Sequence, residues 1–286
     1  MHFPVMLGEC LEYLAIRPDG IFLDATAGLG GHSAAIAARL TSGFVIANDR
    51  DEESLALAKS NAAAHADRIR YHHGSFKNLR EALTANDVQQ VDGLLADLGV
   101  SRYQLTEPVR GFSLMADGPL DMRMDRSQGQ TAEELVNFTS EKELADTIYQ
   151  FGEERRSRKI ARAIVRARPI STTGRLARVI EEAVPRTNRL HPATQTFMAL
   201  RLAVNNEQGE LDALLQAAPD LVKTGGRIVI LSFMSLEDRK IKQSFQALAR
   251  AGRATMLTKH VVRPTPEEIK DNPPSRSAKL RAVEMR

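Results

Sequence analysis

The stretch from Phe22 to Ser33 constrains the fold of this chain more than any other part. It runs from a short apolar segment through a turn with three glycines, Gly28, Gly30 and Gly31, into an alanine-rich pattern that is typical of a helix. A strand, a tight turn and a helix in this order place backbone N–H groups and a helix N-terminus at the carboxyl end of the strand. Open α/β sheets bind nucleotides at that place. We therefore expect a nucleotide-like ligand here, the alternative being that the glycines serve only a tight turn.

A second landmark is Asp49, which follows the next apolar run, Phe44-Val45-Ile46-Ala47. It lies about 20 residues beyond the glycines, which is the spacing of the acidic residue in nucleotide-binding βαβ units. A carboxylate in this position accepts hydrogen bonds from ribose hydroxyls. The spacing therefore predicts that Asp49 binds a ribose.

The composition is that of a globular protein. Of the 286 residues, 43% are hydrophobic and 26% charged, and no apolar segment approaches the ~20 residues that a membrane helix requires. With no signal peptide recognisable at the start, we expect a soluble cytoplasmic protein without a membrane partner. Cys10 is the only cysteine, and the seven histidines show no metal-ligand spacing. We predict no disulfide and no metal site.

The charge is unevenly distributed along the chain. The formal net charge is +3, yet residues 151–190 contain eleven Arg or Lys residues against four Glu residues, so this segment carries +7 and the rest −4. Within it, four basic residues recur at spacings of four, three and four and share one face of a helix, opposite Ile160 and Ile164. The asymmetry predicts a bound polyanion, the alternative being a solvated helix face. The four residues are Arg155, Lys159, Arg162 and Arg166.

Alternating strand and helix patterns predict a doubly wound α/β sheet. Strands are expected at residues 21–25, 44–48, 69–73 and 91–97, with helices between them. The alternation then stops for about 100 residues, which contain a long loop at 101–127 and helical patterns at 131–138, 141–151, 153–168 and 174–184. We interpret residues 106–204 as an inserted all-helical domain that recognises RNA, and residues 1–105 with 205–286 as one discontinuous sheet domain.

The end of the chain distinguishes between nucleotide-binding folds. A fifth strand at 227–231 and a helix at 236–251 precede two strand-like runs, 254–258 and 280–284, whose proline-rich connection is expected to be a loop. Two strands without a crossover helix form an antiparallel hairpin at a sheet edge. Ser33 also stands where a dinucleotide-binding motif has its third glycine. Both features favour a Rossmann-like S-adenosylmethionine (AdoMet)-dependent methyltransferase over an oxidoreductase.

Eight segments, in order, carry a family resemblance that extends over nearly the whole chain. They resemble the bacterial small-subunit (16S) ribosomal RNA cytosine-N4 methyltransferase family, and this implies methylation of the exocyclic amino group of one cytosine in the decoding region of small-subunit RNA. The segments are His2-Phe3-Pro4-Val5, residues 25–33, residues 97–101, Arg110-Gly111-Phe112-Ser113, residues 117–125, His191-Pro192-Ala193-Thr194, residues 235–239 and residues 275–281.

Two positions depart from the family pattern: Met234 replaces a usual His, and Arg102 replaces a common second Ser.

The resemblance also implies the site residues. We assign Arg276 of the last segment to RNA binding together with the basic helix face. The AdoMet contacts implied at matching positions are Gly30, Gly31, His32, Asp49, Phe76, Asp97 and Gln104.

The catalytic candidate is Asp97, at the end of the fourth strand. A cytosine amino nitrogen is a poor nucleophile because its lone pair is delocalised into the ring, so an acceptor for its hydrogens would promote attack on the methyl group of AdoMet. Asp97 fills that role, or it only orients the cofactor. Methylation of a ring carbon would use a cysteine nucleophile, and Cys10 lies outside this motif.

The sequence leaves two other functions open. One is an AdoMet-dependent methyltransferase that acts on another RNA or on a protein amine, and the other is a non-catalytic RNA-binding assembly factor. The expected partner is small-subunit ribosomal RNA. The sequence leaves the oligomeric state open, with a homodimer among the arrangements that it allows.

Overall fold

The computed structural model describes residues 4–185 and 191–286 and divides into two compact units. One unit joins Met1–Gly99 to Gly209–Arg286, and the other is Val100–Gln208. His2 and Phe3 of the first family segment lie outside the described residues, as do residues 186–190 of the basic segment.

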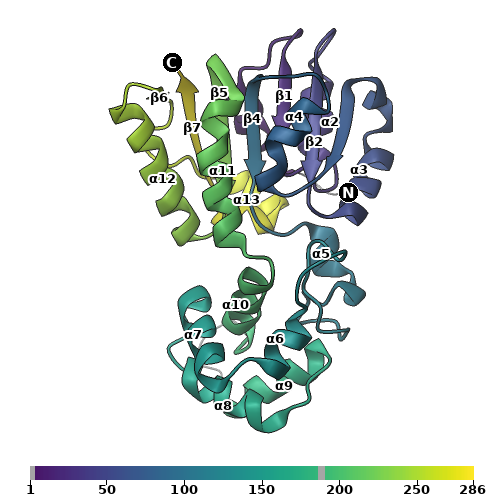
Figure 1. Cartoon of the computed structure of the whole chain (residues 1–286), viewed down its shortest axis with the longest axis vertical. Coiled ribbons are helices and arrows are strands. Elements are labelled where there is room, and N and C mark those ends of the chain that lie inside the picture. Colours follow the sequence, from purple (N-terminus) through teal and green to yellow (C-terminus); the bar gives the residue numbers. More distant parts are fainter. Residues whose placement is uncertain (1–3, 186–190) are drawn as a thin grey trace. The chain divides into compact units, whose positions relative to one another are not determined.

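The first unit contains a seven-stranded sheet with the strand order β3-β2-β1-β4-β5-β7-β6 (Figure 1). The first five strands are parallel, whereas β7 runs antiparallel to both β5 and β6. This confirms the predicted doubly wound methyltransferase fold with an antiparallel C-terminal pair. The strands are β1 (Ile21–Asp24), β2 (Phe44–Asp49), β3 (Ile69–His73), β4 (Val91–Asp97), β5 (Val222–Ser232), β6 (Ala254–Met256) and β7 (Lys279–Met285).

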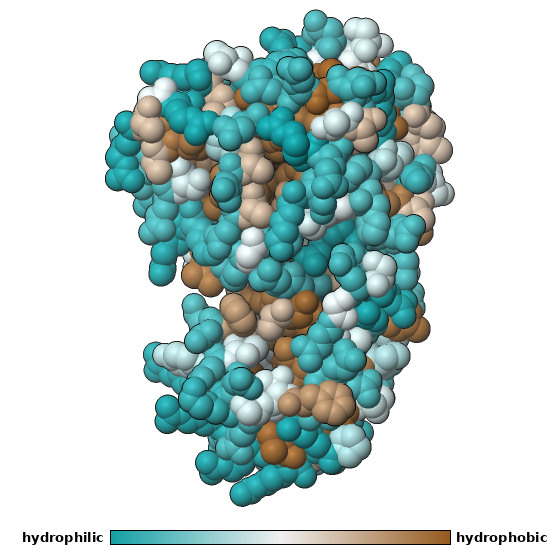
Figure 2. Space-filling model, viewed as in Figure 1, coloured by the Kyte–Doolittle hydropathy of each residue, from teal (hydrophilic) through white to brown (hydrophobic). Residues whose placement is uncertain are grey.

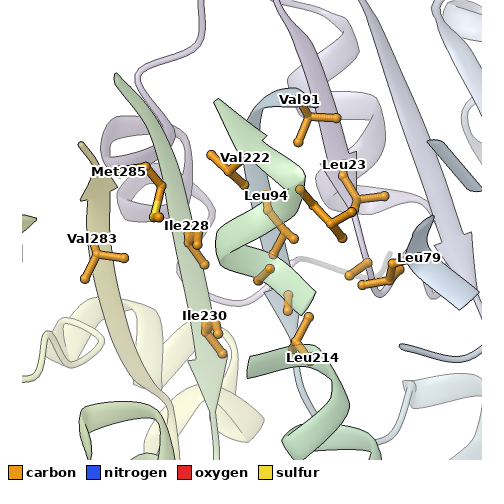
Figure 3. Close-up of a cluster of buried hydrophobic side chains, with 14 of the residues drawn as sticks. Leu23, Leu79, Val91, Leu94, Leu214, Val222, Ile228, Ile230, Val283 and Met285 are labelled. Atoms are coloured by element: carbon orange, nitrogen blue, oxygen red, sulfur yellow. The ribbon is translucent and has the colours of Figure 1, made fainter. Parts of the chain in front are cut away.

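Side chains alternate between two hydrophobic clusters, one on each face of the sheet, because successive residues of a strand point to opposite sides. Leu23 and Leu94 join the cluster drawn in Figure 3, where Leu214 of α11 and Leu79 of α4 meet the strands. Phe22 and Leu95 join the other cluster. The helices that contribute to the first cluster are α4 (Leu79–Thr84), α11 (Glu207–Leu221) and α12 (Ser235–Arg250); those of the second are α1 (Leu7–Leu14), α2 (Gly31–Ala37) and α3 (Glu52–Asn61).

The second unit is helical and has its own core. Its hydrophobic cluster includes Val136, Ile148, Ile164, Ile180 and Leu200, one from each of five helices. The helices of the unit are α5 (Arg102–Thr106), α6 (Ala132–Phe138), α7 (Glu141–Gly152), α8 (Ser157–Ala167), α9 (Thr173–Ala183) and α10 (Thr194–Val204).

The acidic segment 117–125 joins two of these helices. The carbonyl oxygens of Leu120 and Asp121 accept hydrogen bonds at 2.6 and 2.7 Å from backbone N–H groups at the start of α6. Asp117 Oδ1 accepts the N–H of Gly174, in the first turn of α9, at 2.7 Å. The first N–H groups of a helix lack partners within it, so this segment stabilises two helix N-termini.

Two segments that the sequence predicts to be loops contain short helices. Within 101–127, Ser101 and Gln104 form a capping box that begins α5. The proline-rich connection contains α13 (Pro266–Asp271), where Thr265 accepts the N–H of Glu268 and Pro266 occupies the first turn. Proline suits that position because the N–H it lacks would have no partner within the helix. The prediction that no helix separates the last two strands is therefore wrong.

Apolar side chains are largely enclosed in these clusters. The face drawn in Figure 2 is covered mainly by hydrophilic residues, with small apolar patches between them. In the part of the chain that the structure describes, we find no helix with the length and apolar character needed to cross a membrane.

Candidate active site

Three carboxylates lie at the carboxyl edge of the parallel strands. Asp24 ends β1, Asp49 ends β2 and Asp97 ends β4. Since β1 pairs with β2 on one side and with β4 on the other, the three acids follow adjacent strands. This edge is where doubly wound sheets bind ligands.

Asp49 holds the glycine turn. Its Oδ2 accepts the N–H of Gly28 at 2.7 Å, and its Oδ1 accepts the N–H of Asp51 at 2.9 Å. Gly28 and Gly30 have φ of +52° and +86°, in the left-handed region that glycine adopts without strain. Burial raises the pKa of Asp49 to about 6 despite these hydrogen bonds. Asp49 thus fixes the turn in addition to its predicted ribose contact.

Asp24 was not identified from the sequence. It is completely buried, and its carboxylate accepts the Ser33 hydroxyl at 2.6 Å and the Thr26 N–H at 3.1 Å. Burial raises its pKa to about 6. An acidic residue that ends an apolar run immediately before a glycine turn is the sequence signal for this position.

Asp97 differs from the other two acids in its hydrogen bonding. Its N–H donates to Thr26 Oγ1 at 2.6 Å, which links the end of β4 to the glycine turn. The buried Oδ1 of Asp97 has no hydrogen-bond partner among residues 4–185 and 191–286. The side chain is 23% exposed, and burial, together with the charge of Asp24, raises its pKa to about 8. A buried polar atom without a partner is costly, so this oxygen is suited to accept a hydrogen from a ligand.

His32 begins α2 close to this carboxyl group. Its Nδ1 lies 3.8 Å from Asp97 Oδ2, and its Nε2 lies 3.1 Å from the carbonyl oxygen of Val5. The preceding residue, Gly31, faces Pro4 so closely that a Cβ would lie 2.6 Å from the proline Cγ. The segment that contains Pro4 and Val5 therefore packs on the start of α2.

The two remaining cofactor candidates lie in different units. Phe76 follows β3 at the same edge of the sheet, since the N–H of nearby Gly74 donates to the Asp49 carbonyl at 3.0 Å. Gln104 belongs to the helical unit, where its side chain takes part in the capping box with Ser101. The structure thus brings Phe76 to one edge with the glycines, His32, Asp49 and Asp97, and a cofactor contact by Gln104 stays a prediction.

The basic residues predicted to bind RNA are exposed. Lys159, Arg162 and Arg166 lie on α8, and Arg155 precedes this helix. The opposite side of α8 is buried through Ile160 and Ile164, as expected from the spacing. Arg162 Nε lies 3.4 Å from Glu141 Oε1, but this ion pair is solvent-exposed and therefore weak. Arg276 is exposed and belongs to the first unit.

The edge of the sheet fits AdoMet better than a metal ion. Two glycines of the turn have positive φ, Asp49 is an acceptor two strands away from Asp97, and Asp97 offers an unused oxygen. Across the described ranges, no group of three His, Cys, Asp or Glu side chains is placed to hold a metal.

Comparison with known proteins gives a consistent family. The model of the MraW methylase family matches residues 1–286. A protein of Solibacter usitatus named ribosomal RNA small subunit methyltransferase H is 64% identical over 286 residues, which cover 100% of both chains. Proteins of the same name from Acidobacterium capsulatum and Koribacter versatilis are each 50% identical, over 99% of this chain and 98% and 93% of theirs.

Proposed function

Because this chain belongs to the MraW methylase family, we propose that it methylates the exocyclic N4 amino group of a cytosine in the decoding region of small-subunit ribosomal RNA. The broader activity follows from the family and its relatives: the chain is an AdoMet-dependent ribosomal RNA methyltransferase. The choice of cytosine N4 is supported by the eight ordered sequence segments and by the chemistry available at Asp97.

The observation that carries this proposal is the unpartnered, buried Oδ1 of Asp97, beside the glycine turn. Bound AdoMet supplies an electrophilic methyl group. Asp97 would accept a hydrogen from the cytosine amino group and so favour a pyramidal nitrogen whose lone pair is available for attack. Holding the reacting groups in this way can contribute up to ~7–11 kcal/mol of the barrier.

The methylated amino group would also lose one proton, and we assign Asp97 as its acceptor. Its pKa of about 8 lies close to neutral pH, where a general base is most effective. A positive charge beside the carboxyl group lowers this pKa, so binding of a cationic cofactor favours the ionised form that accepts the proton.

The cofactor would be held by the residues at the sheet edge. We assign the backbone of Gly30 and Gly31 to the methionine side, Asp49 to the ribose and Phe76 to the adenine. We also assign His32, whose Nδ1 lies 3.8 Å from Asp97 Oδ2, to the cofactor contacts. Gln104 is assigned to the cofactor by the family resemblance.

The RNA is proposed to contact the basic face of α8. This helix contains four Arg or Lys residues and no acidic residue, which favours phosphate binding. We assign Arg155, Lys159, Arg162 and Arg166 to this contact, and Arg276 to a separate RNA contact in the other unit.

Labelled AdoMet, incubated separately with undermethylated small subunits, free ribosomal RNA and protein, tests the function. We expect label on the N4 atom of one cytosine of the small-subunit RNA, and loss of transfer in Asp97→Ala. Label on a different amine would assign the enzyme another substrate. Intact AdoMet binding without any transfer would instead indicate an assembly factor.

A further inference from the structure

Phe76 begins a single 3₁₀ turn, Phe76–Asn78, at the edge of the sheet. The first N–H groups of such a turn have no partner within it. Ser75 Oγ accepts the N–H of Lys77 at 3.3 Å. The N–H of Phe76 donates at 2.9 Å to Oε2 of Glu210, a residue 134 positions away in the chain.

Glu210 is unusual because it is a buried acid. It is 6% exposed, and a carboxylate loses much solvation at such a position unless hydrogen bonds or charges compensate. It lies in the first turn of α11, where the positive end of the helix dipole stabilises an acid. Its Oε1 also lies 3.5 Å from Lys77 Nζ, but Lys77 is 59% exposed and this ion pair is weak. The hydrogen bond to Phe76 is therefore the principal contact of this carboxylate with the turn.

We propose that Glu210 is a positioning residue that holds the Phe76 ring in place for the adenine of AdoMet. The proposal rests on the assignment of Phe76 to the cofactor site. The Phe76 side chain packs partly against the hydrophobic cluster of Leu23 and Leu94, and Glu210 anchors its backbone. One apolar contact thus holds the ring, and one polar contact holds the backbone that carries it. An aromatic ring that is already ordered loses less conformational entropy when a base stacks on it.

A double-mutant cycle tests this role. The affinity for S-adenosylhomocysteine, the product form of the cofactor, is measured by calorimetry for Glu210→Ala, Phe76→Ala and the double variant. We expect Glu210→Ala to weaken binding about tenfold in the wild-type background and less than about twofold when Phe76 is already alanine, because the lost hydrogen bond acts through the ring.

Two further variants separate the hydrogen bond from charge and folding. Glu210→Gln keeps an oxygen that accepts the Phe76 N–H, so we expect near-wild-type affinity. Asp212→Ala is the matched control, because Asp212 lies on the same helix in an exposed pair with Lys240 at 2.7 Å. It should leave the affinity unchanged.

Each other outcome contradicts the proposal. Equal weakening by Glu210→Ala in both backgrounds would mean that Glu210 supports the unit in general, and weak binding by Glu210→Gln would mean that charge rather than position matters. If Phe76→Ala binds normally, the adenine assignment is wrong and the proposed role of Glu210 is wrong with it. Methyl transfer to RNA by the wild-type protein would still support the proposed function, so the two failures are distinguishable.

Discussion

Asp97→Asn should remove methyl transfer and yet stabilise the protein, increasingly so as the pH rises. In the folded chain the pKa of Asp97 is raised from 3.8 to about 8, first by burial and then by the charge of Asp24. Between these two values the folded protein binds a proton that the unfolded chain releases. Stability conferred by this proton is complete below pH 4 and is lost as the pH rises toward 8.

The pH dependence of this stability difference is set by the binding of one proton. The free energy of unfolding of the wild type falls, relative to Asp97→Asn, by about 1.4 kcal/mol per pH unit. From pH 5 to pH 7 the advantage of Asp97→Asn therefore grows by about 3 kcal/mol, which shifts the midpoint of thermal unfolding by on the order of 5–10 °C. The 23% exposure of the side chain allows solvent to lower the folded-state pKa, which shortens the pH window and leaves the slope within it unchanged.

The assay is urea unfolding of both proteins at half-unit steps from pH 5 to pH 8.5. Asp92→Asn, at the other end of β4, is the control: burial opposes its ionisation, but the Ile21 N–H and the Lys223 ammonium outweigh this and lower the pKa of Asp92. The difference in free energy of unfolding between Asp92→Asn and the wild type should stay constant over this pH range. A constant difference for Asp97→Asn as well would refute the reasoning, because Asp97 would then be ionised throughout.

Three other expectations concern separate parts of the chain. Gly31→Ala places a Cβ 2.6 Å from Pro4 Cγ. We expect this clash to weaken S-adenosylhomocysteine binding, measured by calorimetry, on the order of tenfold. A normal affinity would show that the N-terminal segment moves freely. Asp238→Asn breaks an ion pair with the buried Arg281, whose Nε and Nη2 lie 2.6 and 3.2 Å from the Asp238 carboxylate oxygens. We expect this change to lower the free energy of unfolding, measured in urea, by about 3 kcal/mol. The exposed Asp212→Asn should lower it by less than about 1 kcal/mol. Charge reversal of Lys159, Arg162 and Arg166 should weaken RNA binding in filter-binding assays. The slope of the logarithm of the binding constant against the logarithm of the salt concentration should fall in magnitude by about 2. An unchanged slope would exclude α8 from the RNA contact.

Local signals in the sequence were sufficient for most of the fold. The expected strands 69–73 and 91–97 agree with β3 and β4, because each is a short run with clear ends. The helical pattern expected at 174–184 corresponds to α9, which Thr172 caps by accepting the N–H of Arg175. The proline-rich segment 264–279 was expected to be a loop, but it contains α13 because Pro266 stands in the first helical turn, which tolerates proline.

The contacts of the site depend on residues that are distant in the chain. Parallel topology alone brings Asp49 and Asp97 to one edge, so their proximity follows from the strand assignments. No periodicity indicates that Glu210 bonds to Phe76 or that the carbonyl oxygen of Val5 lies at His32. Such contacts arise from the packing of whole helices and segments, which single-sequence patterns do not encode.

The three acids at the sheet edge have different tasks, and their hydrogen bonds distinguish them. Asp24 and Asp49 both accept backbone N–H groups of the glycine turn, so loss of either carboxylate changes the shape of the turn before it changes any contact with a ligand. Asp97 receives no such bond within the described chain, and its Oδ1 is left for a ligand. Burial of three like charges is costly to the fold, and raised pKa values relieve part of that cost by keeping protons on the carboxyl groups. The same burial that destabilises the fold at high pH therefore brings Asp97 into the range where a carboxyl group exchanges a proton with an amine near neutral pH.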